Sequence, residues 1–562
     1  MKKLIENFII IMVLTIAILF SYALIEKKIS GRSSSEFINF LFSTQEKASS
    51  NKSSVTSNKG NSKKGNNSST QSADTMNYRA VWLSYLEFNS YRKSVKNNNE
   101  SSFRKFYKHI LQQIKTIGCN RIIVQVRPFG DALYASDYFP WAACISGTQG
   151  KNPGYDPLKI MTEMSHKEGI SIEAWINPYR ISSGNSIRSL SKTNPARKWF
   201  SVQNTKRNIL SYEGSLYYNP SSESVRNLII QGVKEIVQNY NVDGIHMDDY
   251  FYPSFTEKNV TTAFDAPEYK QQLKTNLSST DSTSLTSADK SSNEISLADW
   301  RRDNVNRLVS GIYKAVKEIN SDVTFGISPA GNLDNLRSDL EYYVDIDTWV
   351  SQNGYVDYLM PQIYWGFTNE VAPFDKVTDA WCILMENSPV KLYIGLQLYR
   401  MGSTEPGQSD EKELQKTSLL KKELSYLKKQ KKIEGYCLFS YQYLDCQNKK
   451  YHFDAEQFST KRKKLLNQIV KSLKNNSYHL FEKTKNDIPR QISFHYWKIY
   501  DILKIQMYSR NLFVLDFVRR FFVSCVQIFE AYALRTLMKF GCDWHKISHK
   551  IKCKKDSEST LK

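Results

Sequence analysis

The sequence lacks the short motifs that mark metal, redox and nucleic-acid sites. Its eight cysteines include no CxxC pair, and no spacing of histidine and cysteine matches a zinc site. No compact run of lysine and arginine interleaved with aromatic residues is present, although the formal net charge is +21. We therefore expect no metal, no cofactor and no nucleic-acid partner. The cysteines are interpreted most simply as buried thiols, with partial disulfide formation outside the cell as the alternative.

A glycine-rich phosphate loop is also missing after the first predicted strand, which disfavours a doubly wound nucleotide-binding sheet. The chain has instead a succession of short apolar runs, which are typical of buried parallel strands. Eight such runs occur, at residues 79–85, 121–128, 170–179, 243–250, 323–331, 356–365, 391–400 and 435–442. Apolar residues at helical spacing fill the gaps, as in 101–118, 221–240 and 297–320. Eight alternating strands and helices predict an α/β fold of the (β/α)8 TIM-barrel type.

The N-terminal segment bears on the compartment. Residues 1–28 combine Lys2 and Lys3 with an uncharged, mostly apolar run from Phe8 to Ile25. This run is long for a signal peptide and just long enough to span a bilayer, so a cleaved signal peptide and a retained membrane anchor both fit. Both interpretations place the rest of the chain outside the cytoplasm, either secreted or anchored by this segment at the cell envelope.

Three further segments differ from the barrel pattern, which we assign to residues 78–475. Residues 29–77 are mostly a Ser-, Asn- and Lys-rich stretch with the composition of a disordered, flexible linker. The Ser-, Thr-, Asp- and Lys-rich residues 270–296 follow the fourth strand. We expect a mobile loop over the top of the barrel, with a neutral surface insertion as the alternative, which the Ser- and Thr-rich part itself favours. Residues 480–562 read as a basic helical C-terminal extension, which could pack on the barrel, oligomerise or lie on an anionic membrane.

The fourth predicted strand supplies the strongest candidates for catalysis, because the active site of a TIM barrel lies at the carboxyl ends of its strands. This strand ends in Asp248 and Asp249, and no other strand end offers two adjacent carboxylates. Hydrolysis of a glycosidic bond needs two carboxyl groups, one as acid and one as base or nucleophile. Like charges disfavour joint ionisation, so a raised pKa is expected in the pair. The alternative is that the two residues only cap a loop.

The other strand ends carry carboxylates, amides, arginines and aromatic rings. Candidate catalytic partners are Glu87 after the first strand, Asp131 beyond the second and Glu173 within the third. Amides and carboxylates bind sugar hydroxyls, and the faces of Tyr and Trp stack on pyranose rings. The expected substrate-binding residues are Gln125, Arg127, Asn177, Tyr179, Arg180, Tyr250, Gln362, Tyr364, Trp365 and Gln397.

Some of these residues have two interpretations. Glu173 either projects into the barrel near the site or forms a buried ion pair with Arg127. His246 lies two residues before Asp248, and we expect a histidine with its hydrogen bonds satisfied in the lumen rather than a metal ligand. Asp243 precedes a glycine at the start of its strand and is expected on the face that serves stability.

Seven motifs together point to one family. In chain order they are RAVWLSYLEF, VQVRPFGDALYASDYFPW, EAWINPYR, DGIHMDDYFYP, DWRRDNVN, FGISPAGN and YLMPQIYWGF. This set resembles glycosyl-hydrolase-like family 10. The resemblance implies a TIM barrel and hydrolysis of a polysaccharide, and it suggests peptidoglycan glycan as the substrate. It also maps eight residues onto the family's cleft: Gln125, Arg127, Asn177, Arg180, Asp248, Asp249, Gln362 and Tyr364.

The resulting hypothesis is an extracytoplasmic glycoside hydrolase that cleaves a cell-envelope polysaccharide by carboxylate acid/base catalysis. A non-catalytic glycan-binding protein tethered at the surface is the alternative, and a membrane-bound scaffold is a third interpretation. The separation of the carboxyl groups at the cleft discriminates between the first two, because catalysis requires a pair roughly 5–10 Å apart.

Overall fold

The computed structural model describes residues 76–279, 295–405 and 408–487 of the chain. The expected signal or anchor segment, nearly all of the expected linker and the tail beyond residue 487 lie outside the described residues. Within the described ranges, no helix combines the length and the apolar character that crossing a membrane requires.

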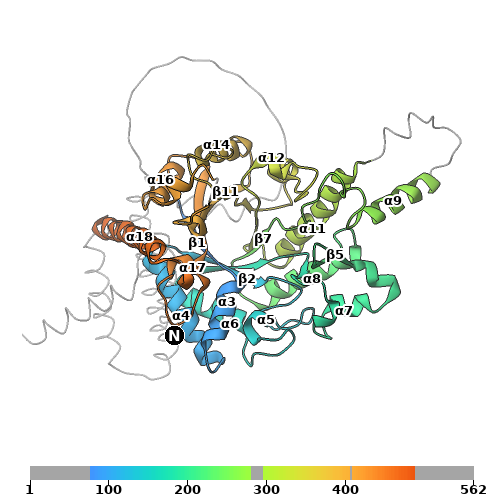
Figure 1. Cartoon of the computed structure of the whole chain (residues 1–562), viewed down its shortest axis with the longest axis horizontal. Coiled ribbons are helices and arrows are strands. Elements are labelled where there is room, and N and C mark those ends of the chain that lie inside the picture. Colours follow the sequence, from blue (N-terminus) through green and yellow to red (C-terminus); the bar gives the residue numbers. More distant parts are fainter. Residues whose placement is uncertain (1–75, 280–294, 406–407, 488–562) are drawn as a thin grey trace, which may run out of the picture. The chain divides into compact units, whose positions relative to one another are not determined.

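The main sheet closes into a barrel whose strands all run parallel (Figure 1). Its strands are β1 (Tyr78–Leu83), β2 (Arg121–Arg127), β3 (Ser171–Ile176), β7 (Gly244–Asp248), β8 (Thr324–Ser328), β9 (Tyr358–Leu359), β10 (Gln362–Ile363), β11 (Lys391–Gln397) and β12 (Ile433–Phe439). β9 pairs with both β8 and β11, which joins the two ends of the sheet. β9 and β10 together occupy the sixth predicted run and are separated by Met360 and Pro361. Pro361 has no N–H for a ladder hydrogen bond, which explains the interruption. The barrel therefore has eight strand positions, which confirms the predicted fold class.

Helices surround the barrel, and several of the longer ones, such as α4, α8 and α11, bury an apolar stripe against it. The longer ones are α3 (Tyr85–Ser94), α4 (Glu100–Thr116), α6 (Pro157–Lys167), α8 (Glu223–Asn239), α9 (Ala266–Ser279), α11 (Leu297–Ile319), α14 (Phe374–Leu384), α16 (Leu419–Leu427) and α18 (Thr460–Asp487). The short ones are α5 (Ala143–Ser146), α7 (Pro195–Phe200), α12 (Leu333–Leu336), α13 (Ile346–Ser351), α15 (Glu411–Leu414) and α17 (Tyr441–Leu444). The three helices proposed from periodicity correspond to α4, α8 and α11. Asn99 begins α4 by accepting a hydrogen bond from the backbone N–H of Ser102 at 3.0 Å, as an N-cap does.

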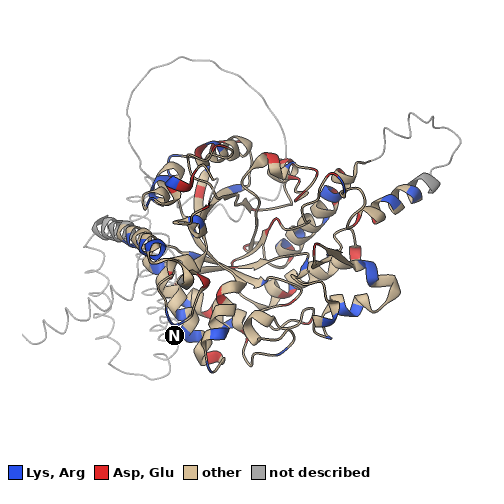
Figure 2. Cartoon of the chain, viewed as in Figure 1, with Lys and Arg blue, Asp and Glu red and all other residues tan. Residues whose placement is uncertain are grey.

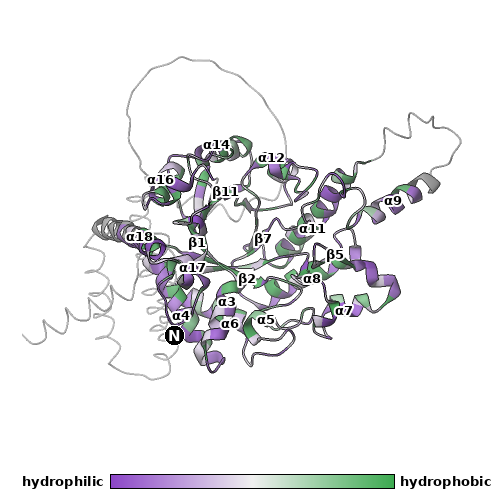
Figure 3. Ribbon diagram, in the orientation of Figure 1, coloured by the Kyte–Doolittle hydropathy of each residue, from purple (hydrophilic) through white to green (hydrophobic). Residues whose placement is uncertain are grey.

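Figure 3 shows hydrophobic residues along the strands and hydrophilic residues on the outward faces of the helices. Figure 2 shows lysine and arginine spread over the outer helices, α9 and α18 among them, with acidic residues interspersed. A second, three-stranded antiparallel sheet is inserted between β3 and α8, in the order β4 (Arg180–Ser182), β6 (Ser215–Tyr218) and β5 (Ile209–Tyr212). This insertion follows the carboxyl end of β3, so it begins at the barrel mouth with Arg180.

Aromatic rings and one carboxylate fill the lower part of the lumen. Glu173 is fully buried there, with its carboxylate 2.9 Å from Arg121 and 2.8 Å from the hydroxyl of Tyr78, and it also accepts a hydrogen bond from Tyr358. Tyr393 stacks on Tyr78 with ring centroids 3.9 Å apart. Glu173 therefore forms a buried ion pair, but with Arg121 and not with Arg127. Its place opposite Gly244, the first residue of β7, puts it at the amino end of the strands, away from a catalytic mouth.

The middle of the lumen holds His246, which is fully buried. Its Nδ1 lies 2.8 Å from the hydroxyl of Tyr358, and its Nε2 lies 3.1 Å from Oγ of Ser328 and 3.2 Å from the indole nitrogen of Trp82. Burial lowers the pKa of His246 to about 3, so the ring is neutral at physiological pH. The expectation of a lumen histidine with its hydrogen bonds satisfied is confirmed. Asp243, just before β7, accepts hydrogen bonds from the backbone N–H of Ile172 and from His166 at the amino end, as expected.

Two expectations for the periphery need correction. Residues 266–279 are the helix α9, so the first part of segment 270–296 is not a loop, and residues 280–294 lie outside the described ranges. Glu, Lys, Gln and Leu are good helix formers, and Gln272 accepts a hydrogen bond from the indole of Trp300 at 2.8 Å, which ties α9 to α11. Figure 1 shows α9 at the outer edge of the fold. The helix α18 runs to Asp487, across the boundary expected near residue 475.

The described cysteines are consistent with buried thiols. Five are described and all five are free: Cys119, Cys144, Cys382, Cys437 and Cys446. Four of them are buried, and Cys382 is half-buried.

We predict that Arg121→Met destabilises the fold by about 3 kcal/mol, because it leaves the Glu173 carboxylate buried without its cation. The matched control is Arg104→Met. Arg104 pairs with Glu100 on α4, but the two side chains are 39% and 54% exposed, so the loss is expected to stay below about 1 kcal/mol. Urea unfolding of both variants measures the difference, and equal losses would contradict the role given to Arg121.

Candidate active site

Asp248 is the last residue of β7 and faces the lumen, where neighbouring strands hold its carboxylate. Its Oδ2 accepts a hydrogen bond from Nδ2 of Asn177 at 2.6 Å and from the indole nitrogen of Trp175 at 3.2 Å. Burial raises the pKa of Asp248 to about 6, and the nearby Arg180 together with these hydrogen bonds opposes that shift. Because this pKa lies below 7, the carboxylate is ionised at neutral pH, although it is only 2% exposed.

Asp249 follows directly and is equally enclosed, at 2% exposure. Its Oδ2 accepts a hydrogen bond from the backbone N–H of Ala330, in the segment after β8, at 2.6 Å. Burial and the adjacent charge of Asp248 raise the pKa of Asp249 to about 8. At neutral pH, then, Asp249 carries a proton while Asp248 is charged. Two neighbouring carboxyl groups whose environments separate their pKa values are typical of a site of acid/base chemistry.

A pocket of about 330 Å³ opens beside this pair, at the carboxyl ends of β8, β10 and β11. It is lined by Ala330, Gly331, Asn335, Tyr342, Gln362, Tyr364, Trp365, Tyr399, Arg400, Glu405 and Gln408. Asp248 and Asp249 are not in the lining. Tyr342 and Tyr364 do line it; burial raises the pKa of both hydroxyls, and the nearby charge of Asp249 contributes in the same direction. Aromatic rings and amides beside a carboxylate pair suit a sugar ring and its hydroxyls.

The predicted substrate residues that reach this region come from three strand ends. Gln362, Tyr364 and Trp365 line the pocket, and their role in binding a substrate stays a prediction. Arg180 lies between aromatic rings, with its guanidinium carbon 5.1 Å from the ring centre of Phe129 and 5.8 Å from that of Tyr250. Tyr250 is 52% exposed and lies next to the pair, so its ring is available to a ligand.

Gln125 and Asn177 form a chain of hydrogen bonds that ends at Asp248. Gln125 donates a hydrogen bond to Oδ1 of Asn177 at 2.5 Å and accepts one from the backbone N–H of Tyr85 at 3.1 Å. The side-chain NH2 of Asn177 in turn donates a hydrogen bond to Asp248. Both side chains are almost fully buried. This chain of hydrogen bonds therefore orients the Asp248 carboxylate from within the barrel.

Three expected substrate residues do not reach the cleft. A β-bulge between Gln125 and Arg127 breaks the alternation of β2, and Arg127 is fully buried with its guanidinium 4.1 Å above the ring of Phe139. Tyr179 lies beyond the end of β3, where strand alternation no longer holds, and is fully buried. Gln397 is fully buried where β11 turns into a short helix, and its amide donates to Glu423 of α16 at 3.3 Å.

Two expected catalytic partners are also engaged elsewhere. Glu87 completes a capping box with Ser84 at the start of α3 and accepts from Ser440 Oγ at 3.0 Å and from the backbone N–H of Gln442 at 3.2 Å. It therefore joins the ends of β1 and β12. Asp131 is buried beneath the segment after β2, where Gln149 donates to it at 3.1 Å. The structure brings neither of them, nor Glu173, to the pocket beside Asp249.

Several pocket residues were not predicted from the sequence. Tyr342 is the clearest example, because it adopts a left-handed backbone with φ of 59°, as does Tyr343 with φ of 53°. Non-glycine residues in this region are strained and concentrate at functional sites. No sequence pattern marks such a turn. Tyr399 and Arg400, by contrast, follow the seventh strand, so their place at a strand end could have identified them.

A buried cluster holds Tyr342 in this position. Arg301 of α11 pairs with Asp265 at 2.9 Å, both side chains being fully enclosed, and donates to the hydroxyl of Tyr343 at 2.8 Å. Asp265 also accepts from Tyr252 at 2.7 Å. The cluster therefore links two segments. Asp265 and Tyr252 belong to the segment after β7, and Tyr343 belongs to the segment after β8, next to Tyr342.

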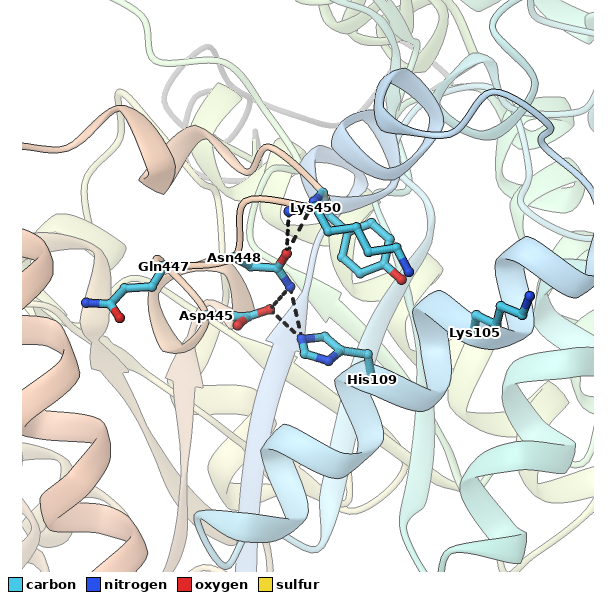
Figure 4. Close-up of a pocket in the computed structure, with 7 residues that line it drawn as sticks. Lys105, His109, Asp445, Gln447, Asn448 and Lys450 are labelled. Atoms are coloured by element: carbon cyan, nitrogen blue, oxygen red, sulfur yellow. Dashed lines mark hydrogen bonds and ion pairs between the residues drawn. The ribbon is translucent and has the colours of Figure 1, made fainter.

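A second hollow, of about 430 Å³, lies on the outside of the barrel between α4 and the segment after α17 (Figure 4). His109 and Asp445 meet there at 2.8 Å, and Asn448 donates to Asp445 at 2.7 Å. The lysines that line it lie at its edge in Figure 4. Asp248 and Asp249 do not line this hollow, and Asp445, its one carboxylate, is already paired with His109. We therefore place the candidate active site at the smaller pocket. Nowhere in the described ranges do three or more His, Cys, Asp or Glu side chains group as a metal site would need.

Comparison with known proteins decides the family. The model of the family described as glycosyl hydrolase-like 10 matches residues 77–412. The chain belongs to this family. Glycosyl hydrolase YngK of Bacillus subtilis is 35% identical over 369 residues, a match that spans 62% of this chain and 66%, just under two thirds, of that protein. Glycosyl hydrolase DigH of Escherichia coli K12 is 33% identical over 351 residues, spanning 60% of this chain and 75% of DigH.

Among solved structures, the glycoside hydrolase domain of PgaB (BpsB) from Bordetella bronchiseptica is similar at 12% identity and a TM-score of 0.43, covering 67% of this chain and 97% of that domain. The family match covers every strand up to β11 and ends before β12, which completes the barrel. All the residues placed around the carboxyl pair above lie within it.

We predict that Asp249→Asn stabilises the fold. An unfolded aspartate ionises near 3.8, whereas the folded group ionises near 8, so the wild-type protein loses stability as the pH rises through this window. Asparagine keeps an acceptor for the N–H of Ala330 and carries no charge. The gain should be on the order of 1–3 kcal/mol at pH 9 and small at pH 4.

Urea unfolding of both proteins at the two pH values measures this effect. Asp243→Asn is the control, and it should lower the free energy of unfolding, because asparagine is a weaker acceptor for the N–H of Ile172. A gain that does not grow with pH would show that the Asp249 charge is not the cause.

Proposed function

We propose that this protein is an extracytoplasmic glycoside hydrolase that cleaves a cell-envelope polysaccharide, namely peptidoglycan glycan strands. The observation that carries the proposal is the Asp248–Asp249 pair, enclosed at the carboxyl end of β7 beside an aromatic pocket. The names of the similar proteins YngK and DigH support a glycosyl hydrolase activity. The apolar run from Phe8 to Ile25 supports export, with the chain secreted or anchored at the envelope.

The pKa order of the pair assigns the roles. Asp249, protonated at neutral pH, is the general acid that protonates the leaving oxygen, and Asp248 is the charged group that stabilises positive charge developing on the sugar. Arg180 and Asn177 keep Asp248 ionised and oriented. The rings of Tyr250, Tyr364 and Trp365 offer surfaces for the pyranose rings on either side of the bond.

We predict that Asp248→Asn and Asp249→Asn each lower glycan cleavage by about a thousandfold or more. Asparagine keeps the shape of the side chain, so folding and glycan binding should persist. The test is incubation of the full-length protein with purified peptidoglycan glycan, with and without its peptides, followed by mass analysis of products. Asp243→Asn is the control and should affect thermal stability more than turnover.

The outcomes separate the candidate functions. Near wild-type cleavage by both variants would refute the assignment of the pair. Binding of glycan without any cleavage by the wild-type protein would favour the alternative, a surface-tethered glycan-binding protein.

The pair also predicts a bell-shaped pH dependence. Activity should rise as Asp248 loses its proton through a pKa of about 6, and it should fall as Asp249 loses its proton through a pKa of about 8. The measurement is kcat/KM for glycan cleavage between pH 4 and 10. A profile that stays flat through pH 8 and above would contradict the role of Asp249 as the acid.

A further inference from the structure

The segment between β4 and β5 carries positive charge only. Residues 183–208, which we call the basic arm, contain no aspartate or glutamate. Their lysines and arginines are Arg188, Lys192, Arg197, Lys198, Lys206 and Arg207. The arm includes the short helix α7, on which Figure 2 shows blue and no red. It therefore presents one sign of charge, although acidic and basic residues are interspersed over the other outer helices.

Most of these cations have no acidic partner. Arg207 pairs with Glu268 of α9 at 2.6 Å. Arg197 donates to the backbone carbonyl oxygens of Arg188 at 3.1 Å and Leu190 at 2.6 Å, so it fastens the arm internally. The other four cations are exposed and form no ion pair with any carboxylate of the described residues: Arg188, Lys192, Lys198 and Lys206. Their charge is therefore available to a partner.

The arm is fixed on its inner side. Asn194 is fully buried and donates a hydrogen bond to the backbone carbonyl oxygen of Gly130 at 2.8 Å. Its side-chain oxygen accepts from the backbone N–H of Ala196 at 2.9 Å, which begins α7. The ring of Trp199 packs edge-on against Tyr218 of β6, with ring centroids 6.1 Å apart. The outward side of the arm is therefore held in a defined position.

Two large apolar side chains lie on that outward side. Phe200 is 39% exposed and Val202 is 53% exposed. Single exposed apolar residues are ordinary on protein surfaces. In the described part of the chain, however, no other two exposed large apolar side chains lie so close in sequence. Nζ of Lys206 lies 5.2 Å from the ring centre of Phe200, so apolar and cationic groups share one patch.

We propose that the basic arm docks on a lipid surface with anionic headgroups, where Phe200 and Val202 enter the boundary between headgroups and acyl chains. Cations beside a negatively charged leaflet and apolar side chains that leave water are the two terms that bind a peripheral protein to a membrane. The arm starts at Arg180 and is fastened to Gly130, and both follow the carboxyl ends of strands. Docking therefore takes place on the side of the barrel that carries the pocket. This inference goes beyond the proposed hydrolase function and does not depend on it.

The patch fits other occupants less well. A soluble polyanion would bind the four cations but leave Phe200 and Val202 in water, so the apolar part of the patch would gain nothing. A second copy of the chain, related by a two-fold axis, would place the same patch against itself and bring like charges together. An anionic lipid surface satisfies the charge and the apolar groups at once.

The test is amide hydrogen exchange of the full-length protein, because it reports on residues 195–206 themselves and not on other segments that contact lipid. Exchange is measured with vesicles of equal parts phosphatidylcholine and phosphatidylglycerol, with vesicles of phosphatidylcholine alone, and with polyphosphate at the same phosphate concentration. The anionic vesicles should slow exchange in residues 195–206 at least about fivefold, and the other two additions less than about twofold. Added salt should reduce the slowing, because it screens exposed charges.

A pair of charge variants separates the arm from the net charge of the chain. Lys198→Gln combined with Lys206→Gln removes two exposed cations of the arm, and most of the slowing should be lost. The matched control combines Lys105→Gln with Lys108→Gln, two exposed lysines of α4, and removes the same charge elsewhere. The control should keep the slowing of the wild type. Equal losses in the two double variants would overturn the role of the arm.

A second pair of variants tests the apolar contact. Phe200→Ser combined with Val202→Ser should also lose most of the slowing, each protein being compared with itself in the absence of lipid. The control combines Val371→Ser with Ile383→Ser, whose side chains are 86% and 73% exposed, and it should behave as the wild type. Full slowing in the Phe200 and Val202 variant would overturn insertion into the lipid.

The remaining outcomes identify the other occupants. Slowing by polyphosphate equal to that by anionic vesicles would overturn the lipid surface in favour of a soluble polyanion. Slowing that grows with protein concentration in the absence of lipid would overturn it in favour of a second copy of the chain. Equal slowing by both kinds of vesicle would show that anionic headgroups are not recognised, which also contradicts the inference.

Discussion

The filling of the barrel lumen decides where polar groups can lie in this protein. At the amino end, Glu173 is balanced by Arg121 and by tyrosine hydroxyls. Above it, His246 is neutral and uses both ring nitrogens in hydrogen bonds. Tyr358 joins these two layers by hydrogen bonds to both residues, and the carboxyl groups without a cation at hydrogen-bond distance lie at the top, on Asp248 and Asp249. The chemistry of the mouth follows from this arrangement, because two carboxyl groups enclosed side by side cannot both ionise at neutral pH.

The sequence predicts most of this architecture for physical reasons. Strands covered on both sides must be almost continuously apolar, so eight such runs mark eight strand positions, and the sixth is split only because Pro361 interrupts its ladder. Position along a strand also places the carboxyl pair at the catalytic end. The direction of a side chain is less predictable. A bulge turns Arg127 out of the lumen, and Tyr179 and Gln397 lie where strand alternation stops.

Hydrogen-bond partners distant in sequence explain the remaining differences. Glu87 looks like a free carboxylate after a strand, but its partners Ser440 and Gln442 come from the other end of the barrel and cannot be read from local sequence. Trp175, inside the third strand, donates directly to Asp248. The aromatic content of the chain thus serves the core and the site together: an indole can pack its ring in the lumen while its N–H fixes a carboxylate.

The cluster of Arg301, Asp265 and Tyr343 has an evolutionary consequence. It fastens the segments after β7 and β8 to each other at a point between the carboxyl pair and α9. Changes in α9, beyond that point, are mechanically insulated from Tyr342 and Asp249. Substitutions in α9 are therefore expected to leave the geometry around the carboxyl pair unchanged, so this edge of the fold tolerates change around a fixed centre.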